Sequence, residues 1–277
     1  MKETATSVET HYGVGGILAS IFDALHALGK DLDHLTPADL APVDEFHIRG
    51  REATAELAQL AELSPNLRVL DVGCGLGGST RYLASEYGCR TTGIDLTREY
   101  CEIAAALSAR VGLGEVVDYH HGSALEMPFD DATFDIAWTE HAQMNIGDKT
   151  ALYTEIARVL KPGGRLVFHD IFQGAGGELH YPAPWAENPS ISFLVTPEVL
   201  RNILAQAGLR ALVWEDKTAV SLDWFRRTVE RMQTAPPSPL GLHLLTGENS
   251  KTKFGNMIRN LEEGRIVVLQ AILQRVG

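Results

Sequence analysis

The chain has little of several features that mark particular protein classes. Among its 277 residues there is no run of about 18 apolar residues, so no membrane-spanning helix is expected. The N-terminal stretch MKETATSVETHYG is polar and lacks the apolar core of a signal peptide, so a cytoplasmic location is expected. Lys and Arg number 24 against 36 Asp and Glu, and the net charge of −12 argues against a nucleic-acid backbone as partner.

Cysteine is also scarce. The three cysteines, Cys74, Cys89 and Cys101, have neither metal-type spacing nor the pattern of a disulfide framework, and we expect them to fill small buried spaces. No H-E-x-x-H motif occurs, and the adjacent His120 and His121 would alternate between the two faces of a strand. A bound metal is therefore not expected.

A glycine-rich turn between an expected strand and an expected helix is the most informative stretch of the chain. The sequence RVLDV at 68–72 is typical of a buried strand, and GCGLGGST follows it. Glycine is favoured where the backbone takes a positive φ or where a ligand comes close. A helix N-terminus offers unpaired N–H groups and a positive dipole end to a polar ligand. The combination predicts a cofactor site.

The spacing of the glycines admits two cofactors. Gly73, Gly75 and Gly78 satisfy the dinucleotide fingerprint G-x-G-x-x-G, whereas Gly73, Gly75 and Gly77 satisfy the D-x-G-x-G-x-G turn that binds S-adenosylmethionine (SAM). Asp71 favours SAM, because its charge would repel a pyrophosphate but not a ligand ammonium. A glycine turn that holds no ligand is the remaining alternative.

Asp95 ends the next expected strand. It lies about twenty residues beyond the glycines, where a carboxylate can accept hydrogen bonds from both ribose hydroxyls. SAM and NAD proteins share this feature, so it indicates a nucleoside without choosing between the two. The alternative role of Asp95 is to cap the following helix, for which Thr97 is the better residue.

Strand and helix patterns alternate after residue 63, which indicates a doubly wound, mainly parallel sheet. We expect an α/β, Rossmann-like fold with helices on both faces of a seven-stranded sheet, whose strands are 68–72, 90–95, 116–120, 134–139, 165–170, 209–215 and 265–272. Residues 1–63 should form an N-terminal helical cap or lid. Residues 64–277 should form the cofactor-binding domain, with irregular insertions at about 172–195 and 235–253.

Four motifs in order resemble class I SAM-dependent methyltransferases: DVGCGLGG, GID, HGSALEMPFDDATFDIAW and RVLKPGGRL. Dehydrogenases lack the latter two, so the resemblance favours SAM over a dinucleotide. It covers about residues 68–215 and implies a SAM-dependent methyltransferase. Within this superfamily the chain is most similar to the small-molecule methyltransferases of the sarcosine/dimethylglycine and phosphoethanolamine type.

The resemblance also implies which residues hold the cofactor. Gly73 and Gly75 would pass close to the methionine part, Asp95 would hold the ribose, and Ser123 and Ala124 would lie beside the adenine. The complete expected cofactor-binding set is Asp71, Gly73, Cys74, Gly75, Gly77, Asp95, Leu96, Ser123, Ala124, Glu140 and Gly50.

Two N-terminal segments resemble parts of the phosphoethanolamine methyltransferases. The stretch FHIRGREAT around Gly50 is similar to the segment that covers the cofactor there, with its glycine against SAM. His11 and Tyr12 are similar to a Gln-Tyr pair whose tyrosine belongs to a lid over the sulfonium. The resemblance thus implies that Tyr12 closes the site and orients the methyl acceptor.

The acceptor side is expected where the fourth strand ends, in the sequence TEHAQMNI. His141 is the first catalytic candidate, because an imidazole can take a proton from an amine, hydroxyl or thiol as it is methylated. His169, at the end of the fifth strand, is the second, and Tyr12 is the third. For each histidine the alternative is a hydrogen-bonded structural role. Glu140 would contact the methionine ammonium or cap the loop.

Two features argue against a phosphobase as acceptor. Phosphoethanolamine methyltransferases carry an Asp and a His at the positions of His141 and Asn145, and this chain has no basic cluster to hold a phosphate. The aromatic residues of the loop at 172–195, among them Trp185, are expected to wall the acceptor pocket, while Trp224 is expected in the core.

We therefore expect a SAM-dependent methyltransferase that moves a methyl group to a small-molecule acceptor by in-line displacement, a reaction that needs positioning and exclusion of water. An amine is the favoured acceptor, and a hydroxyl or a carbon acid is the alternative. A non-catalytic SAM-binding protein and an NAD(P) oxidoreductase are the rivals from other classes. A homodimer is compatible with the sequence, and neither nucleic acid nor membrane is an expected partner.

Overall fold

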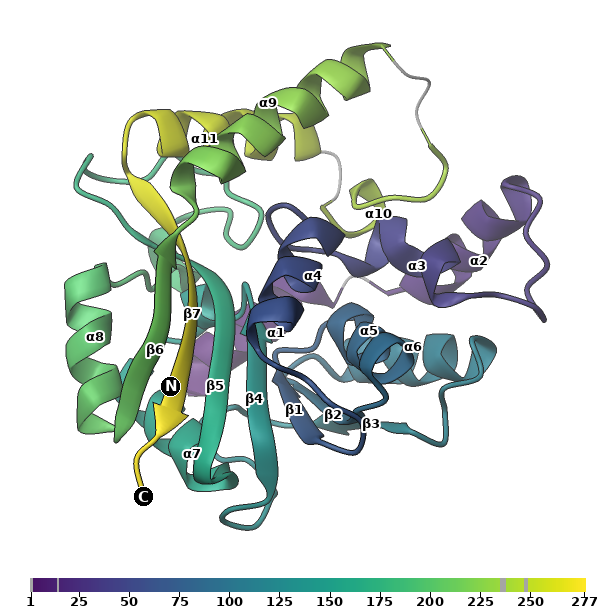
Figure 1. The fold of residues 1–277 in the computed structure, drawn as a ribbon. Helices are drawn as coiled ribbons and strands as arrows, with labels where there is room; N and C mark the ends of the chain where they lie inside the picture. Colours follow the sequence, from purple (N-terminus) through teal and green to yellow (C-terminus); the bar gives the residue numbers. More distant parts are fainter. Residues whose placement is uncertain (1, 14, 235–237, 247–248) are drawn as a thin grey trace.

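The computed structural model describes residues 2–13, 15–234, 238–246 and 249–277. It contains one seven-stranded sheet of order β3-β2-β1-β4-β5-β7-β6 (Figure 1). The strands are β1 (Arg68–Val72), β2 (Arg90–Asp95), β3 (Val117–His121), β4 (Phe134–Glu140), β5 (Leu160–Gln173), β6 (Leu209–Asp216) and β7 (Ile266–Arg275). β7 runs antiparallel to β5 and β6, and the other pairings are parallel. The expected Rossmann-like fold class is confirmed.

Helices precede the sheet, connect its strands and cover its edge. They are α1 (Lys2–Tyr12), α2 (Ile17–Ala27), α3 (Pro37–Asp44), α4 (Arg51–Leu60), α5 (Gly78–Tyr87), α6 (Arg98–Arg110), α7 (Lys149–Val159), α8 (Pro197–Gln206), α9 (Thr218–Thr234), α10 (His243–Thr246) and α11 (Ser250–Glu262), with short 3₁₀ helices η1 (Gln143–Asn145) and η2 (Pro189–Ile191). In the described ranges, none of these helices combines the length and the apolar character that crossing a membrane requires.

The structure corrects several expected boundaries. β5 begins at Leu160 rather than at Arg165, because Leu160 pairs with Phe134 and Arg165 with Ile136. The sequence KPGG between them therefore bulges out of the strand instead of forming a separate turn. β7 runs on to Arg275, where it pairs with the start of β6. β3 is shifted by one residue at both ends, β4 and β6 each end one residue later than expected, and β7 begins one residue later.

The two expected insertions differ in regularity. The first, at 172–195, is irregular apart from the end of β5 and the short helix η2, as expected. The second, at 235–253, contains α10 and the first turn of α11, so it is more regular than expected. Residues 235–237 and 247–248 of this insertion lie outside the described residues.

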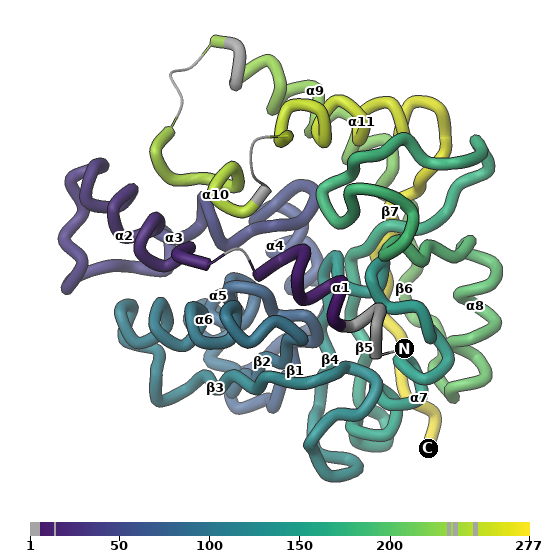
Figure 2. Tube along the Cα trace, turned by 180° about the vertical axis from the view of Figure 1, so that it is seen from behind, coloured from purple at the N-terminus to yellow at the C-terminus, as the bar shows by residue number. Residues whose placement is uncertain are grey.

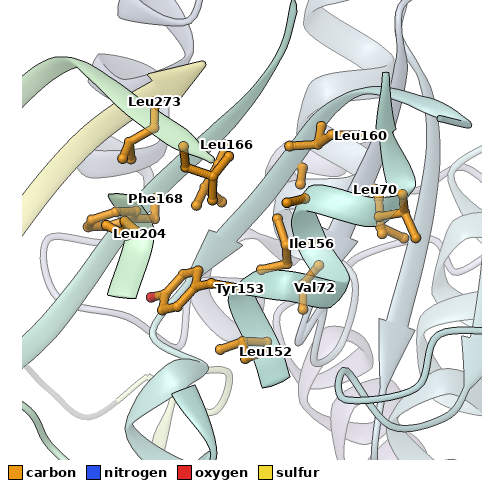
Figure 3. Close-up of a cluster of buried hydrophobic side chains, with 14 of the residues drawn as sticks. Leu70, Val72, Leu152, Tyr153, Ile156, Leu160, Leu166, Phe168, Leu204 and Leu273 are labelled. Atoms are coloured by element: carbon orange, nitrogen blue, oxygen red, sulfur yellow. The ribbon is translucent and has the colours of Figure 1, made fainter. Parts of the chain in front are cut away.

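Alternation along β1 divides the core between the two faces of the sheet. Leu70 lies in a buried cluster with Ile156 of α7 on one face, together with residues of α8 (Figure 3). Val69 lies on the other face, in a cluster with Leu57 of α4 and Leu83 of α5. Helices therefore cover both faces, as expected, and the strands between them have little freedom to move.

The remaining helices gather beyond the carboxyl ends of the parallel strands. α9 and α11 lie side by side there, and α10 approaches α2, so N-terminal and C-terminal segments meet over the same edge (Figures 1 and 2). α2 and α3 share a buried cluster with α6, in which Ile21 and Leu40 pack with Ile103. In open α/β sheets this carboxyl edge is where ligands bind.

Candidate active site

A cavity of about 690 Å³ lies at the carboxyl edge of the parallel strands. The residues expected at the site that line it are Tyr12, Asp71, Gly73, Cys74, Gly75, Asp95, Leu96, Ser123, Ala124, Glu140 and His141. Gly50, Gly77 and His169, which are all described by the structure, do not line it. Most of the expected residues are thus brought together in one place, although they come from distant parts of the chain.

The three glycines of the turn have positive φ but differ in their surroundings. A Cβ at Gly73 would lie 2.4 Å from the Cβ of Ala142, and one at Gly77 would lie 2.3 Å from the hydroxyl of Tyr119. A Cβ at Gly75 would have nothing within 4 Å. Gly75 therefore borders open space that a ligand can fill, whereas Gly77 is required for packing at the N-cap of α5.

Asp95 is anchored by two backbone N–H groups. Its Oδ2 accepts a hydrogen bond from Gly75 N at 3.0 Å, and its Oδ1 accepts one from Thr97 N at 2.8 Å. Burial raises its pKa, while these backbone bonds lower it. Thr97 occupies the N-cap of α6 but makes no side-chain capping bond, so the cap expected from it is not formed. Each Asp95 oxygen keeps a lone pair that can accept from a ribose hydroxyl.

Two further carboxylates line the cavity near the glycine turn. Asp71 accepts a hydrogen bond from the Thr80 hydroxyl at 2.6 Å, and burial raises its pKa to about 7. Glu140 accepts bonds from the Ser79 hydroxyl at 2.6 Å and from Trp138 Nε1 at 2.9 Å. Two neighbouring carboxylates in a partly apolar cavity favour a cationic ligand group, such as the ammonium of SAM.

Ser123 and Ala124 form the part of the cavity wall that follows β3. The Ser123 hydroxyl oxygen accepts a hydrogen bond from Leu125 N at 3.2 Å, which leaves its own O–H free to donate. Together with the open space at Gly75, the acceptors of Asp95 and the carboxylates Asp71 and Glu140, this wall fits a nucleoside that carries a cationic amino-acid part.

His141 lies in a tight bend just after β4. Its φ is +50°, which is uncommon for a residue other than glycine, and its N–H donates to the carbonyl of His169 at 3.0 Å. Asp170 holds the bend, because its Oδ2 accepts from the N–H groups of Ala142 and Gln143, both at 3.2 Å. The Nε2 of His141 is buried without a hydrogen-bond partner.

His141 belongs to a cluster of three histidines. Its ring stacks on that of His169 with centroids 5.3 Å apart, and the ring of His47 lies 6.0 Å away. Burial, and then the neighbouring histidines, lower the pKa of His141 well below 6.5. Burial likewise lowers the pKa of His169, to about 3. Burial alone would also lower that of His47, but Glu140 and Glu45 raise it to about 9.

The charge in this cluster is therefore confined to one ring. His47 is protonated at neutral pH and bonds to Glu45 at 2.9 Å. His141 and His169 are neutral, and a neutral imidazole keeps one nitrogen as an acceptor. Of the two neutral rings, that of His141 lines the cavity.

Tyr12 connects the N-terminal helix to the loop after β4. Its hydroxyl donates to Asn145 Oδ1 at 3.0 Å, and burial raises its pKa. Asn145 Nδ2 donates in turn to the carbonyls of Trp185 and Ile191, at 2.9 and 2.8 Å. Three separate segments are thus joined at the mouth of the site through one amide side chain.

A smaller chamber of about 50 Å³ adjoins the cavity, and we call it the inner chamber. Tyr12, Phe46, His47 and His141 line both spaces. The other walls of the inner chamber are Ile48, Met144, Ile171, Pro184, Trp185, Trp224, Phe225, Leu242, Phe254 and Met257. Trp185 is a wall residue, as expected, and Trp224 is one too, although the sequence placed it in the core.

Sequence reasoning missed two residues of the site. His47 lies within the FHIRGREAT stretch, and its proximity to Glu140 could have been suspected only from the fold. Lys149 is the first residue of α7, and its buried ammonium donates to the carbonyls of Gln143, Ile146 and Phe193. Its pattern in the sequence carries no signal for these contacts, which join the loop after β4 to the loop after β5.

Comparison with known proteins identifies the family. Residues 70–168 match the family model described as a methyltransferase domain. The O-methyltransferase resE of Aspergillus sclerotiorum is 30% identical over 183 residues, which are 64% of this chain and 68% of that protein. The chain belongs to the class I SAM-dependent methyltransferases. The cofactor of this methyltransferase is therefore SAM, as the sequence motifs implied.

Relatives of this methyltransferase act on different atoms. The glycine/sarcosine/dimethylglycine N-methyltransferase of Actinopolyspora halophila is 26% identical over 222 residues, 78% of this chain and 39% of that protein. A geranyl diphosphate C-methyltransferase from Streptomyces coelicolor A3(2), solved with Mg²⁺, geranyl diphosphate and S-adenosyl-L-homocysteine, is similar in fold, with a TM-score of 0.72, 16% identity and coverage of 99% of this chain and 98% of that one.

The family alone therefore does not determine the acceptor. N- and O-methyltransferases both occur among the relatives, and a C-methyltransferase shares the fold. The chain also spans only part of the curated relatives, between 32% and 64% of the length of the first four. The resemblance to the sarcosine/dimethylglycine and phosphoethanolamine enzymes is confirmed at the level of the family.

Proposed function

We propose that this protein transfers a methyl group from SAM to a small-molecule acceptor. SAM supplies an electrophilic methyl group on a sulfonium sulfur, which a nucleophile displaces in line. The proposal is supported chiefly by one observation: the cofactor cavity and the apolar inner chamber meet at Tyr12, Phe46, His47 and His141. Two spaces with a shared wall can hold a donor and an acceptor next to one another and exclude water.

In this proposal the cavity residues divide the binding of SAM among themselves. Asp95 accepts from the ribose hydroxyls, and Asp71 and Glu140 face the ammonium. Gly73 and Gly75 allow the backbone to approach the ligand. The remaining expected residues of the cavity wall are Cys74, Leu96, Ser123 and Ala124.

Gly50 and Gly77 support the site from outside the cavity in this proposal. Gly50 has φ +48° and ψ −139° at the N-cap of α4, a backbone conformation that other residues rarely adopt. It thereby shapes the segment that carries Phe46 and His47. Gly77 allows α5 to begin close to Tyr119.

His141 is the proposed catalytic residue that accepts a hydrogen bond from the reacting group. Its imidazole is neutral, lines both spaces and has a buried Nε2 that lacks a partner, so it can accept a hydrogen bond from the acceptor's N–H or O–H. We assign His169 a positioning role, because its carbonyl and ring contact His141 while its side chain does not reach the cavity. Tyr12 closes the site at the bond with Asn145.

An amine is the acceptor that the family likeness to the N-methyltransferases favours. It would have to enter as the neutral base, because an ammonium has no lone pair to attack with and is costly to bury. A hydroxyl is the second candidate. It is favoured by the walls of the inner chamber, among whose described residues no carboxylate stands ready to pair with an ammonium.

Turnover with a panel of acceptors tests the proposal. The purified protein is titrated with SAM and, separately, with NADH by calorimetry. It is then incubated with SAM and amines, phenols or thiols, and S-adenosylhomocysteine is quantified. We expect SAM binding and S-adenosylhomocysteine formation that depends on the acceptor. Tight SAM binding without product from any acceptor would indicate a non-catalytic SAM-binding protein, and binding of NADH alone would indicate an oxidoreductase.

A further inference from the structure

The composition of the inner chamber restricts the chemistry of its occupant. Nine of its fourteen wall residues are Phe, Trp, Ile or Met, and Pro184 and Leu242 add two more apolar side chains. They come from the segment before α4, from η1, β5 and the loop after it, from α9 and α11, and from the segment before α10. None of the described wall residues is Asp, Glu, Lys or Arg. We infer that the methyl acceptor is an uncharged molecule with a predominantly apolar body that lies between the two spaces, since the inner chamber, at about 50 Å³, takes only its apolar end.

The one charge in the wall is already compensated. His47 is protonated at neutral pH, but its Nε2 bonds to Glu45 at 2.9 Å and its Nδ1 lies 3.8 Å from Glu140. A carboxylate or phosphate in the chamber would therefore compete with two buried carboxylates for a single imidazolium. Burial of a charge that lacks a partner is strongly unfavourable. An ammonium would also lack a partner, because no carboxylate is among the described wall residues of the chamber and Glu140 lines the cofactor cavity instead.

The polar groups around the chamber are mostly occupied as well. The indole N–H of Trp185 donates to the Ser192 hydroxyl at 2.9 Å, and the amide of Asn145 is bonded to Trp185 and Ile191. Two ring nitrogens are the exceptions, since Nε2 of His141 and Nδ1 of His47 are buried without a hydrogen-bond partner. Both residues also line the cofactor cavity, so they lie at the junction of the two spaces. The geometry suits an acceptor with one hydrogen-bonding group at that junction and hydrocarbon beyond it.

An unfilled defect in core packing is the competing explanation of the chamber. Several wall residues, including Ile48, Met144, Trp185, Phe225 and Met257, belong to one buried cluster, and cores are normally packed without voids. Four wall residues are shared with the cofactor cavity, however, so the chamber continues a ligand site and is not an isolated void. This continuity favours a role of the chamber in binding the methyl acceptor. That inference rests on the proposed methyl transfer.

Binding of three matched phenols tests the inference without requiring turnover. The full-length protein is saturated with S-adenosylhomocysteine and titrated by calorimetry with 4-methylphenol, 4-hydroxybenzoate and tyramine, which share a phenol ring and differ in charge. We expect 4-methylphenol to bind saturably and roughly tenfold or more tightly than either charged compound. Equal or tighter binding of a charged compound, or no binding of 4-methylphenol, overturns the inference.

The same measurement separates this inference from the proposed function. Preferred binding of the neutral phenol with no methyl transfer to any acceptor would sink the proposed function and leave the apolar specificity intact. Efficient methylation of an amino acid or a phosphorylated acceptor would support the proposed function and overturn the inferred preference for an uncharged acceptor.

Variants connect the preference to the chamber. Met257→Lys adds a cation to the wall, and we expect it to reverse the preference, so that 4-hydroxybenzoate binds roughly tenfold tighter than 4-methylphenol. Val199→Lys on the exposed face of α8 is the matched control and should change neither affinity.

Should Met257→Lys fail to fold, Trp224→Ala provides a second test. It should weaken the binding of 4-methylphenol roughly fivefold and leave the affinity for S-adenosylhomocysteine unchanged. Wild-type phenol affinity in Trp224→Ala would contradict the assignment.

Discussion

The proposed role of His141 depends on three properties of its surroundings, which the residue type alone does not determine. It is neutral because it is buried, it is aimed by a strained bend that Asp170 holds, and its Nε2 lacks a partner in the resting protein. A group that moves or holds a proton typically contributes between about 100-fold and 10,000-fold to a rate. Removal of the ring should therefore affect the reaction far more than the binding of SAM.

We predict that His141→Ala lowers turnover by about 100-fold or more and leaves the SAM dissociation constant within roughly threefold of wild type. Acceptor-dependent formation of S-adenosylhomocysteine and calorimetric titration of SAM provide the two measurements. His34→Ala, at an exposed histidine far along the chain, is the control and should change neither. Turnover that survives within a few-fold would make His141 a residue that only shapes the pocket.

Asp95 is predicted to act on binding alone. Asp95→Ala removes two acceptors for the ribose and also frees the backbone N–H groups of Gly75 and Thr97, so SAM should bind roughly 10- to 100-fold more weakly. Calorimetry with SAM and with S-adenosylhomocysteine measures the change. Asp118→Ala, at an exposed position of the neighbouring strand β3, should have no effect. An Asp95 variant that binds SAM as tightly as wild type would refute the ribose assignment.

His169 predicts a pH dependence of stability. Burial lowers its pKa from 6.5 to about 3 in the folded protein, so between these values the unfolded chain binds a proton that the folded chain does not. The stability that neutral His169 contributes is therefore complete above the unfolded pKa of 6.5, and it is lost as the pH falls from 6.5 to about 3. The buried Asp170, whose pKa is raised to about 7, makes the protein more stable as the pH falls. Because wild type and every variant compared contain Asp170, its effect is common to all of them.

His169→Gln should reduce the loss of stability on acidification by up to about 1.4 kcal/mol per pH unit, the value for one proton. Urea titrations of wild type and variant at several pH values between about 4 and about 6.5 measure the difference in slope. His34→Gln is the exposed control and should retain the wild-type slope. The same slope in wild type and in His169→Gln would show that His169 is not held neutral.

At the scale of elements, the site depends on how the loops after β4 and β5 are joined. The buried ammonium of Lys149 donates to Gln143 O at 2.6 Å, to Ile146 O and to Phe193 O at 2.8 Å. Burial lowers its pKa to about 8, so it is still mostly charged at neutral pH. One side chain thus bonds three carbonyls, of which the carbonyl of Gln143 also accepts from Ile146 N at the end of η1.

We predict that Lys149→Met destabilises the fold by about 2–4 kcal/mol, because it leaves buried carbonyls without donors. It should also weaken the binding of both SAM and the acceptor, since Lys149 and Asn145 line the cofactor cavity and Met144 lines the inner chamber. Urea unfolding and the two titrations measure these effects. Lys251→Met, at an exposed position of α11, is the control and should leave stability unchanged. A Lys149→Met protein as stable as wild type would contradict the prediction.

The elements also show what the sequence can reveal and what it cannot. β1, the glycine turn and β2 are predicted almost residue by residue, because an apolar run, positive φ at glycine and a carboxylate at a strand end are local signals. The KPGG bulge in β5 depends on pairing with β4, and no local pattern specifies it. Likewise, the charge on His47 depends on Glu140, which lies far along the chain.

At the scale of the whole molecule, the N-terminal helices are as much part of the site as the sheet is. Tyr12 and Phe46 line both spaces, and Trp224 and Met257, from near the other end of the chain, line the inner chamber with them. α2 and α3 share a buried cluster with α6. We therefore expect the predicted cap at 1–63 and the predicted cofactor domain to unfold together, although the sequence separates them by their patterns.

A buried ion pair provides the test of this coupling. Asp44, at the end of α3, bonds to Arg81 of α5 at 2.5 Å, and both side chains are almost fully buried. Burial raises the pKa of Asp44 to about 6, although Arg81 lowers it, so the carboxylate depends on its partner. Arg81 also donates to the carbonyl of Ala104 and the hydroxyl of Ser108, which connects α3 and α5 to α6.

We predict that Arg81→Met destabilises the protein by about 3–5 kcal/mol, because it leaves a buried charge without a partner, and that Asp44→Leu combined with Arg81→Met recovers much of the loss. Arg226→Met, which breaks an exposed pair with Glu262, should leave stability unchanged. Unfolding is followed by urea titration with two probes. Tryptophan fluorescence reports on the part of the chain that holds the four tryptophans, all of which lie beyond residue 63, and circular dichroism reports on the whole chain. Coincident transitions in Arg81→Met would support one cooperative unit, whereas an early loss of helix ahead of the fluorescence change would show that the N-terminal helices unfold by themselves.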